Sequence, residues 1–561
     1  ASSNASEGTS RIMRITSTKS RFLAVLSSAA LVAAVVVSGP AHAASTDPVC
    51  DGKAPVQTCT GTTSDGALYE MRIPADYTGT AMIWSHGFGT NAAVPAGVLP
   101  IFPNGVPVDP RPNLSPANSE ALNAYVLSKG VALMGSGFST QAWNLDEAVK
   151  TNTELIGIFK AKFPTTSKVV AWGYSMGGGI TQAFAEQHPE LISAAAVINP
   201  VDGSDAMLKY LGDTLWLFKT FFDPTIKAGN YSAGKAGDME MVADIGKVLT
   251  VLGSLQSSVS TGAWPATSSA TGKALEAAGV PSRSALLLIG LLTGQSTQSK
   301  TFDSISGPDG ALKLTFPLAV SPALAVLENT ATALSYGLFF ARDIDQKFGG
   351  LVFDNTTTDY TAMLSEDDRD IYNAALSGNT AVNAMLGALN PANPGAPRQA
   401  GTPAAMAKYK AQYNITGKIT VPTVMVIGLH DPVEPAGIVQ RIQDKYNVQF
   451  AAEKAAAMAA AKKSRSYVAP VNKLNVIWST SPASWTKFTA AGLPYAIGNT
   501  PGTGHTNFSP AHYKLVIDSV LQASATGKLP SGGPWATAVR KAKDLKIDKF
   551  SSFPYMKYYQ Q

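Results

Sequence analysis

Apolar and polar positions follow two different rhythms along this chain, and the change of rhythm divides it into parts. Between residues 68 and 200, short apolar runs such as LYEMRIP, TAMIWSHGF and KVVAWG alternate with longer amphipathic segments. In WNLDEAVKTNTELIGIFKAKF, apolar residues recur at helical spacing, which is typical of an amphipathic helix. Strands that alternate with helices predict an α/β fold with a mostly parallel sheet covered by helices on both faces.

The alternation stops after residue 203 and resumes near residue 417 with KITVPTVMVIG. The residues between contain apolar runs and loops rich in Gly, Pro, Ser and Thr, which predicts a large, mainly helical cap inserted between strands. We therefore predict an α/β core in two parts, residues 44–203 and 417–530, with a cap of residues 204–416. We assign no function to a C-terminal tail of residues 531–561. The alanine-rich AAEKAAAMAAAKKS, from residue 451, predicts a surface helix.

Two apolar runs in the predicted cap have two interpretations. One run carries Trp216, Phe218, Phe221 and Phe222, and the other is Ala285–Leu292. Such runs most often form a core, but they could also wall a pocket for an acyl chain or an aromatic group. The sequence therefore leaves the substrate open.

Composition indicates a globular protein and gives little sign of a nucleic-acid partner. Of the 561 residues, 45% are hydrophobic and 15% are charged. The formal net charge is +5, but four basic residues and one acidic residue lie in the first 43 positions, and without them it is +2. No long basic stripe remains in the rest of the chain.

The first 43 residues have the pattern of a secretory signal peptide. Basic residues up to Arg21 precede a 16-residue apolar run, Phe22–Val37, and the motif AHA follows at residues 41–43. We predict a signal peptide of residues 1–43, cleaved near Ala43-Ala44, and a secreted, extracellular or periplasmic protein with no stable membrane span after cleavage. The alternative is an uncleaved anchor, for which this run is short because a spanning helix needs about 20 residues.

The two cysteines lie close together, just after the predicted cleavage site. Cys50 and Cys59 bound the segment CDGKAPVQTC. In an exported protein such a pair predicts a small disulfide loop, and two thiols alone rarely hold a metal ion.

A serine between two glycines is the first sign of chemistry. Ser175 stands in GYSMG, between the strand-like KVVAWG and the helical GGITQAFAEQH. At such a strand-to-helix bend the glycines permit the tight turn and the serine hydroxyl projects outward as a nucleophile. The alternative is a glycine-rich turn of an ordinary α/β sheet.

A serine nucleophile needs a base, and six histidines are available. His505, in the glycine-rich NTPGTGHTNFS just past the last predicted strand, LPYAIG, is the best placed to reach the sheet edge. A plain loop histidine is the alternative. The others have simpler explanations: His42 leaves with the signal, His86 belongs to the turn SHGFG, His188 ends the helix after Ser175, His430 adjoins an acid and His512 opens the last helix.

The base in turn needs an acid to orient it. Asp431 directly follows VPTVMVIGLH, at the carboxyl end of a predicted parallel strand, where such sheets place functional groups. Serine, aspartate and histidine then follow one another in the order of a known hydrolase motif. The rival acids are Asp202, which also follows a strand, and Glu434.

The turn SHGFG predicts the remaining part, an oxyanion hole. Backbone N–H groups of Phe88, in this turn, and of Met176, after the predicted nucleophile, could bind a developing oxyanion. A purely structural His-Gly turn is the alternative.

These motifs, SHGFG, GYSMG, GLHDPVEP and GTGHTN in this order, resemble the alpha/beta-hydrolase superfamily, specifically secreted serine esterases with a large helical cap. The resemblance covers about residues 68–202 and 419–523. The segment GSGFSTQAWNLDEAVKT is also similar to tannase and feruloyl-esterase-like members, whose cysteine pair beside the triad has no counterpart here.

The resemblance implies a function. It implies Ser175 as nucleophile, Asp431 as acid, His505 as base, and Phe88 and Met176 as oxyanion donors. The expected activity is hydrolysis of a small-molecule or polymeric carboxylic ester, with no metal or organic cofactor. A serine peptidase or acyltransferase would use the same triad, and a non-catalytic binding protein could keep the fold.

Overall fold

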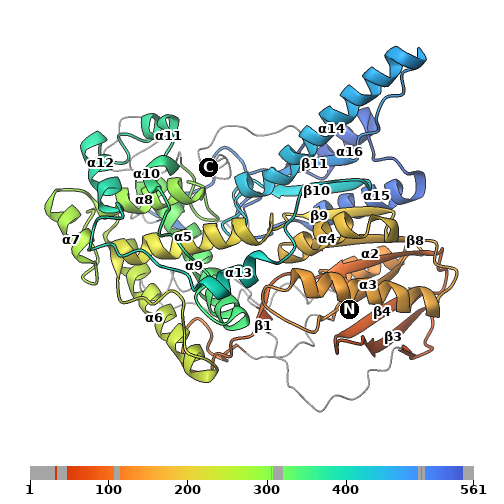
Figure 1. Ribbon diagram of the computed structural model, residues 1–561, viewed down its shortest axis with the longest axis horizontal. Coiled ribbons are helices and arrows are strands. Elements are labelled where there is room, and N and C mark those ends of the chain that lie inside the picture. Colours follow the sequence, from red (N-terminus) through yellow and green to blue (C-terminus); the bar gives the residue numbers. More distant parts are fainter. Residues whose placement is uncertain are drawn as a thin grey trace.

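A computed structural model describes residues 32–33, 47–106, 114–304, 306, 320–490, 494–495 and 500–547. Its centre is a ten-stranded sheet with the strand order β14-β11-β10-β9-β8-β5-β7-β4-β3-β2 (Figure 1). The six middle strands are parallel, and antiparallel pairing is confined to the two edges. The prediction of a mostly parallel sheet is confirmed.

The strand bounds are as follows. The parallel strands are β5 (Thr80–Ser85), β7 (Ala132–Ser136), β8 (Lys168–Tyr174), β9 (Ala194–Ile198), β10 (Thr423–Gly428) and β11 (Leu474–Ser479). The edge strands are β2 (Val49–Cys50), β3 (Val56–Thr62), β4 (Leu68–Pro74) and β14 (Leu545–Lys546). Two further pairs are β1 (Val32–Ala33) with β6 (Gly89–Thr90), and β12 (Lys487–Phe488) with β13 (Pro494–Tyr495).

Helices cover both faces of this sheet. Alternate strand residues enter two separate cores, so that Ile83 and Val197 belong to one and Met82 and Ile198 to the other. Burial on both faces explains why these strands read as continuous apolar runs. One face carries α3 (Leu145–Lys162), α4 (Met176–Gln187) and the start of α14 (Ala436–Ser464); the other carries α2 (Glu120–Leu127), α15 (Pro510–Thr526) and α16 (Gly532–Lys541).

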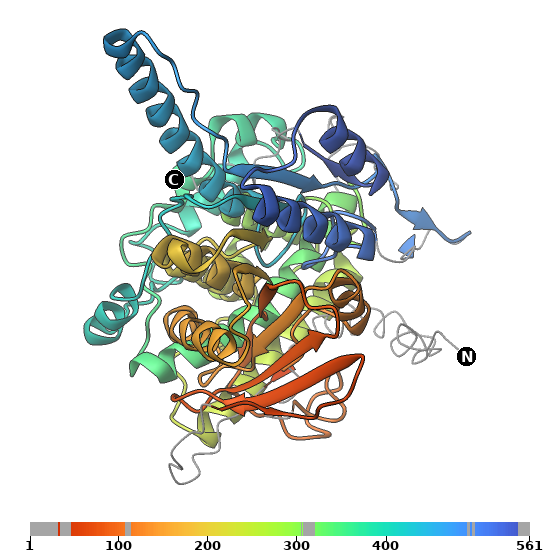
Figure 2. The same cartoon turned by 90° about the vertical axis from the view of Figure 1, so that its right-hand side faces the viewer.

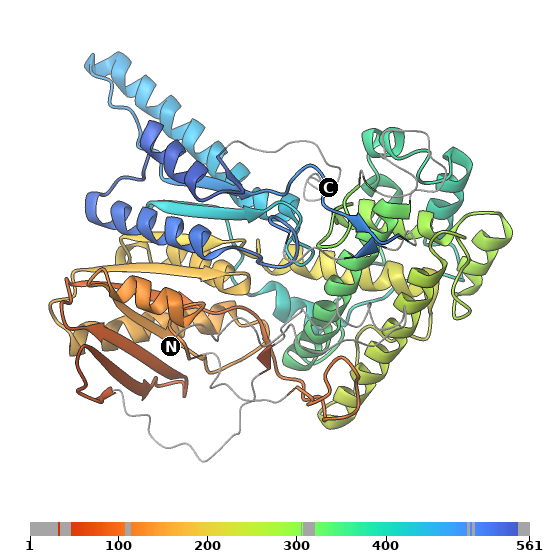
Figure 3. The same cartoon turned by 180° about the vertical axis from the view of Figure 1, so that it is seen from behind.

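The segment between β9 and β10 is a helical cap that lies beyond one end of the sheet (Figure 3). Both apolar runs singled out in the sequence are buried in this cap, where they belong to one continuous core. Its helices are α5 (Ser204–Phe222), α6 (Lys235–Ser258), α7 (Ala270–Ala277), α8 (Ser282–Thr293), α9 (Val320–Phe348), α10 (Tyr360–Met363), α11 (Glu366–Ile371), α12 (Asn379–Ala388) and α13 (Pro403–Lys410). The predicted insertion of a mainly helical cap is confirmed.

The predicted alanine-rich surface helix is the outer half of a longer one. Helix α14 packs on the sheet through Ile438, Val439 and Ile442, and then continues outward as a projecting arm (Figure 2). Beyond Tyr446 its side chains are exposed or half-buried, including Met458 at 58%. Alanine has the highest helix propensity, which suits a segment that has few neighbours to hold it.

The two cysteines form the predicted disulfide, which links β2 to β3 at one edge of the sheet. Most of the predicted signal peptide, its cleavage site included, and residues 548–561 of the tail lie outside the described residues. Val32–Ala33 is the part of the signal segment that the structure places, as β1 beside β6. Among the described residues, no helix combines the length and the apolar character needed to cross a bilayer.

We expect the double substitution Cys50→Ser and Cys59→Ser to lower the free energy of unfolding by about 2 kcal/mol, because it frees a short loop in the unfolded chain. Urea denaturation of both proteins measures the difference. Wild-type protein treated with dithiothreitol is the control and should show the same loss. Equal unfolding midpoints would contradict a stabilising role for this bond.

Candidate active site

Ser175 lies at a sharp turn between β8 and α4. Its φ of +56° is uncommon for a residue with a side chain. The turn is fixed by its backbone, because Ser175 N donates to the carbonyl of Ile198 at 3.0 Å and its own carbonyl accepts from Gly179 N at 3.1 Å. This conformation is the strand-to-helix elbow that the sequence predicted, with the serine at its tip.

The flanking glycines are required by close backbone contact. A Cβ added to Gly177 would overlap the carbonyl oxygens of Ser85 and His86, and one added to Gly173 would overlap the carbonyl oxygen of Gly177. The elbow therefore packs directly against the end of β5 and the turn that follows it.

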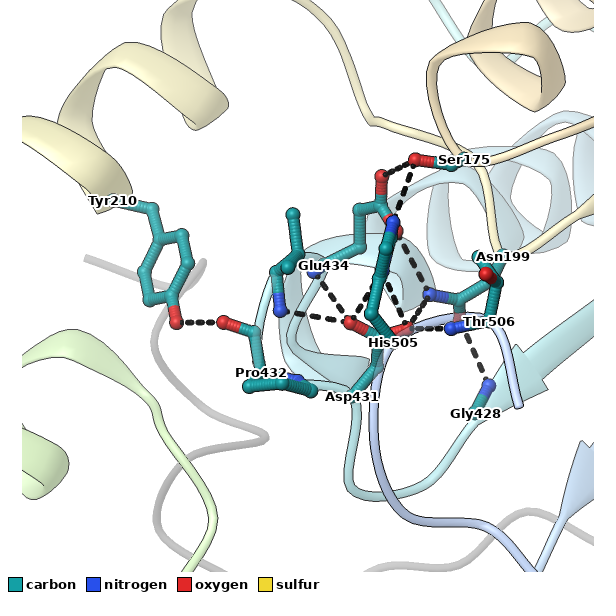
Figure 4. A network of polar contacts seen from close by, with 10 residues as sticks. Ser175, Asn199, Tyr210, Gly428, Asp431, Pro432, Glu434, His505 and Thr506 are labelled. Carbon is teal, nitrogen blue, oxygen red and sulfur yellow. Dashed lines mark hydrogen bonds and ion pairs between the residues drawn. The ribbon is translucent and has the colours of Figure 1, made fainter. Parts of the chain in front are cut away.

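Ser175, His505 and Asp431 form one chain of hydrogen bonds (Figure 4). Ser175 Oγ lies 3.0 Å from His505 Nε2. On the other side of the ring, Nδ1 lies 3.1 Å from each carboxylate oxygen of Asp431. The structure thus brings together three residues that the sequence singled out separately.

Asp431 is held by backbone and side-chain N–H groups. Its Oδ1 accepts from Val433 N at 2.8 Å and from Glu434 N at 2.9 Å. Its Oδ2 accepts from Thr506 N at 2.8 Å and from Asn199 Nδ2 at 2.9 Å. Four donors fix the orientation of this carboxylate and stabilise its negative charge.

Asn199 is a site residue that the sequence reasoning missed. It follows β9 directly, has a φ of +40°, and accepts from Gly428 N at 2.8 Å through its side-chain oxygen. Its amide nitrogen donates both to Asp431 and, at 3.2 Å, to Glu434. A polar residue directly after a buried strand was the available signal.

Glu434 was named only as a rival to Asp431, and the structure places both carboxyl groups at the site. Ser175 Oγ lies 2.7 Å from Glu434 Oε1, and His505 Nδ1 lies 3.3 Å from Glu434 Oε2 (Figure 4). Both acids are buried, at 2% exposure for Asp431 and 1% for Glu434.

Asp202, the other rival acid, lies elsewhere. It is buried and forms an ion pair with Arg441, whose Nε is 3.0 Å away. Burial raises the pKa of Asp202 to about 7, against the opposing effect of Arg441. This ion pair links the loop after β9 to helix α14.

The other described histidines contact groups other than Ser175. His86 Nδ1 contacts the carbonyl of Gly87 at 2.7 Å, His188 faces Glu190 at 3.4 Å, and His512 Nε2 contacts the carbonyl of Lys543 at 2.8 Å. His430 is buried with Nδ1 2.7 Å from Ser296 Oγ, and burial lowers its pKa to about 3. His42 lies outside the described residues.

The segment before His505 differs from the prediction in one respect. Of the predicted strand LPYAIG, the structure describes Pro494 and Tyr495, which form β13 and pair with β12 outside the main sheet. The last parallel strand is β11, and His505 follows on a long connection from it. A backbone hydrogen bond holds this connection beside the loop of Asp431: His430 N donates to the carbonyl of Gly502 at 2.8 Å.

The turn SHGFG lies beside the elbow. A Cβ placed on Gly87 would lie 3.7 Å from the Cβ of Ser175. Phe88 packs on the large core, and Met176 is the first residue of α4. The two residues predicted as oxyanion donors therefore belong to segments that meet at Ser175.

Two tyrosines are among the cap residues that reach the site. The ring of Tyr336, on α9, lies edge-on to His505 with centroids 5.2 Å apart. Tyr210, on α5, donates to the carbonyl of Pro432 at 2.5 Å, on the loop that carries Asp431 (Figure 4). The cap therefore helps to enclose the buried acids.

Burial and charge act against each other at His505. Burial alone would lower its pKa, but the neighbouring carboxyl groups of Asp431 and Glu434 outweigh this effect and raise it. Lys300, from the cap, opposes the rise.

Asp431, Glu434 and His505 are also the one group of His, Cys, Asp and Glu side chains, among the described residues, close enough to share a metal ion. One candidate atom from each lies within 4.8 Å of the others. Both nitrogens of His505 already have partners, Ser175 on one side and the acids on the other. A metal ion there would have to displace one of these contacts.

A model of the alpha/beta hydrolase fold matches residues 133–230, a stretch that runs from β7 through the Ser175 elbow into the cap. The chain has an alpha/beta-hydrolase fold. Among curated protein sequences, none matches it.

Solved structures with related arrangements include several hydrolases. Feruloyl esterase B from Aspergillus oryzae is 14% identical, with a TM-score of 0.35 over 85% of this chain and 82% of that one. The rice cell wall degrading esterase LipA from Xanthomonas oryzae is 12% identical, with a TM-score of 0.29 over 84% and 89%. Candida antarctica lipase A is 16% identical with a TM-score of 0.22, and the match covers 29% of this chain and 43% of the lipase. Similarity at this level identifies neither a substrate nor a reaction.

We expect Gly177→Ala to destabilise the protein by about 1–3 kcal/mol, because its methyl group would overlap the backbone of β5. Thermal unfolding followed by circular dichroism measures the loss. Gly157→Ala is the matched control, since Gly157 lies in α3 with no atom within 4 Å of an added Cβ. We expect that variant to be about 0.5–1 kcal/mol more stable. Equal effects of the two substitutions would contradict the packing of the elbow.

Proposed function

We propose that this protein is a secreted serine hydrolase that cleaves carboxylic esters through an acyl-enzyme on Ser175. The observation that carries the proposal is the continuous hydrogen-bond chain from Ser175 through His505 to Asp431, on a strand-to-helix elbow of an alpha/beta-hydrolase fold. The disulfide between Cys50 and Cys59 supports export, because such bonds persist in oxidising compartments.

In the first half of the reaction, Ser175 Oγ attacks the ester carbonyl and its proton passes to His505 Nε2. The carbonyl oxygen then carries the negative charge, and the backbone N–H groups of Phe88 and Met176 are the proposed donors to it. Asp431 orients the imidazole and stabilises its charged form. His505 next protonates the leaving alcohol, and the acyl group remains on Ser175.

In the second half, water replaces the alcohol. His505 takes a proton from water as it attacks the acyl carbon, and returns it to Ser175 Oγ when the acid product leaves. The same groups act in both halves because Nε2 of His505 faces the serine oxygen throughout.

We expect Ser175→Ala to abolish labelling by a fluorophosphonate probe and to lower kcat/KM on a chromogenic short-chain ester by at least about 10³-fold, since the nucleophile is lost. Ser257→Ala, on the exposed face of α6, is the matched control and should label and turn over like the wild type. Wild-type protein that neither labels nor hydrolyses any ester would overturn the proposal. Turnover of amides but not esters would make the protein a peptidase, and transfer to an added alcohol in preference to water would make it an acyltransferase.

We expect chelation to leave the reaction unchanged, because the proposed mechanism uses Nε2 of His505 for proton transfer and Nδ1 for the hydrogen bond to Asp431, which leaves neither nitrogen for a metal ion. Dialysis against EDTA followed by the same ester assay tests this. The outcome against it is a loss of activity that added Zn²⁺ restores.

A further inference from the structure

Glu434 is a buried acid that takes no part in the hydrogen-bond chain from Ser175 through His505 to Asp431. Its Oε1 lies 2.7 Å from Ser175 Oγ, nearer than the 3.0 Å that separates Oγ from His505 Nε2. Its Oε2 lies 3.2 Å from Asn199 Nδ2 and 3.3 Å from His505 Nδ1. The carboxyl group therefore contacts the proposed nucleophile directly.

The two neighbouring acids are supported unequally. Asp431 accepts four N–H groups, which stabilise its negative charge. Glu434 shares the amide of Asn199 with Asp431, and its other polar contacts are Ser175 and His505. No Lys or Arg of the described chain forms an ion pair with either acid. Two buried negative charges this close repel each other, so the less supported acid is the one that binds a proton.

The electrostatics agree with this geometry. Burial raises the pKa of Glu434, and the charge of Asp431 raises it further, against the opposing effect of His505. Burial also raises the pKa of three neighbouring tyrosines, Tyr174, Tyr210 and Tyr336, so their hydroxyl groups are neutral at ordinary pH. The titratable and charged groups that face Glu434 and His505 are Asp431 on the same loop, Tyr174 at the end of β8, Tyr210 on α5, Tyr336 on α9 and Lys300 between α8 and α9.

We propose that Glu434 is a further catalytic residue, whose protonated carboxyl group donates a hydrogen bond to Ser175 Oγ and so directs the serine proton toward His505. This inference rests on the proposed nucleophilic role of Ser175. Three hydrogen bonds then follow one another in the same direction: Glu434 donates to Ser175 Oγ, Ser175 Oγ donates to His505 Nε2, and His505 Nδ1 donates to Asp431. An ionised Glu434 would reverse the first bond, because it would accept the serine proton that His505 needs.

The chemical step remains balanced without an added reagent. As Ser175 Oγ bonds to the carbonyl carbon, the π electron pair moves to the carbonyl oxygen and the serine proton moves to His505. Glu434 keeps its proton during attack. When Ser175 Oγ leaves in the second half, the same donor faces the oxygen that gains negative charge.

The proposal predicts a bell-shaped pH dependence of kcat/KM for the wild type. Activity rises as the coupled pair of His505 and Glu434 loses its first proton and falls as it loses the second, because only the form whose one proton is on Glu434 is active. Glu434→Gln keeps a donor but cannot ionise. Glu434 is neutral in the active form, so we expect the neutral glutamine to leave the rising limb in place and the falling limb to disappear.

Glu434→Leu separates donation from packing. It fills similar space but cannot donate, and we expect its maximal kcat/KM to be about tenfold below that of Glu434→Gln. Asp213→Asn is the matched control, because Asp213 is a buried acid on α5 that is paired with Lys209 rather than with the site. We expect both limbs of its profile to coincide with those of the wild type.

The outcomes divide clearly. A falling limb that persists in Glu434→Gln, or equal maximal rates in the Gln and Leu variants, would overturn the role of Glu434 and leave the ester hydrolase proposal standing. Absence of labelling and turnover in the wild type would overturn both. The wild type also gives a test that needs no folded variant, because its rate of fluorophosphonate labelling must fall on the alkaline side. A rate that stays level there would overturn the role of Glu434.

Discussion

The backbone pairing of β8, β9 and β10 continues past the ends of the strands, and the geometry of the site depends on it. Ser175 N donates to the carbonyl of Ile198, and Asn199 N donates to the carbonyl of Val426 at 2.7 Å. The turns that follow these three neighbouring parallel strands are thereby held together at the carboxyl ends of the strands. Ser175, Asn199 and Asp431 meet there although they are far apart in the sequence, because parallel strands end on the same side.

The sequence carried the fold class and the identities of the main side chains. The alternation of apolar runs and helical segments predicted the parallel sheet, and the interruption after residue 203 predicted the cap. Gly173 and Gly177 marked the elbow because a tight bend and close packing both exclude a side chain. These signals are local, so one sequence is enough to find them.

The meeting of the two acids at one site could not be predicted in the same way. It requires the register of β9 against β10 and the path of the long connection to His505, which short stretches of sequence do not encode. A sequence reading had to choose between Asp431 and Glu434, whereas the amide of Asn199 binds both. For the same reason, the sequence did not show that Pro494 and Tyr495, in the strand expected before His505, lie outside the main sheet.

Helix α9 contacts both His505 and the segment that follows the SHGFG turn. Tyr336 and Asp343 lie seven residues apart, and hence on one face of the helix. The first packs against His505, and the second accepts the hydroxyl of Thr90 at 2.7 Å, just after the SHGFG turn. Asp343 is itself paired with Arg342 at 2.9 Å, although burial still raises the pKa of Asp343 to about 6.

This bracing has a consequence for how α9 can move. A displacement of the helix would separate Tyr336 from His505 and Asp343 from Thr90 together. The position of the imidazole and that of the segment after β5 are therefore mechanically coupled through one helix.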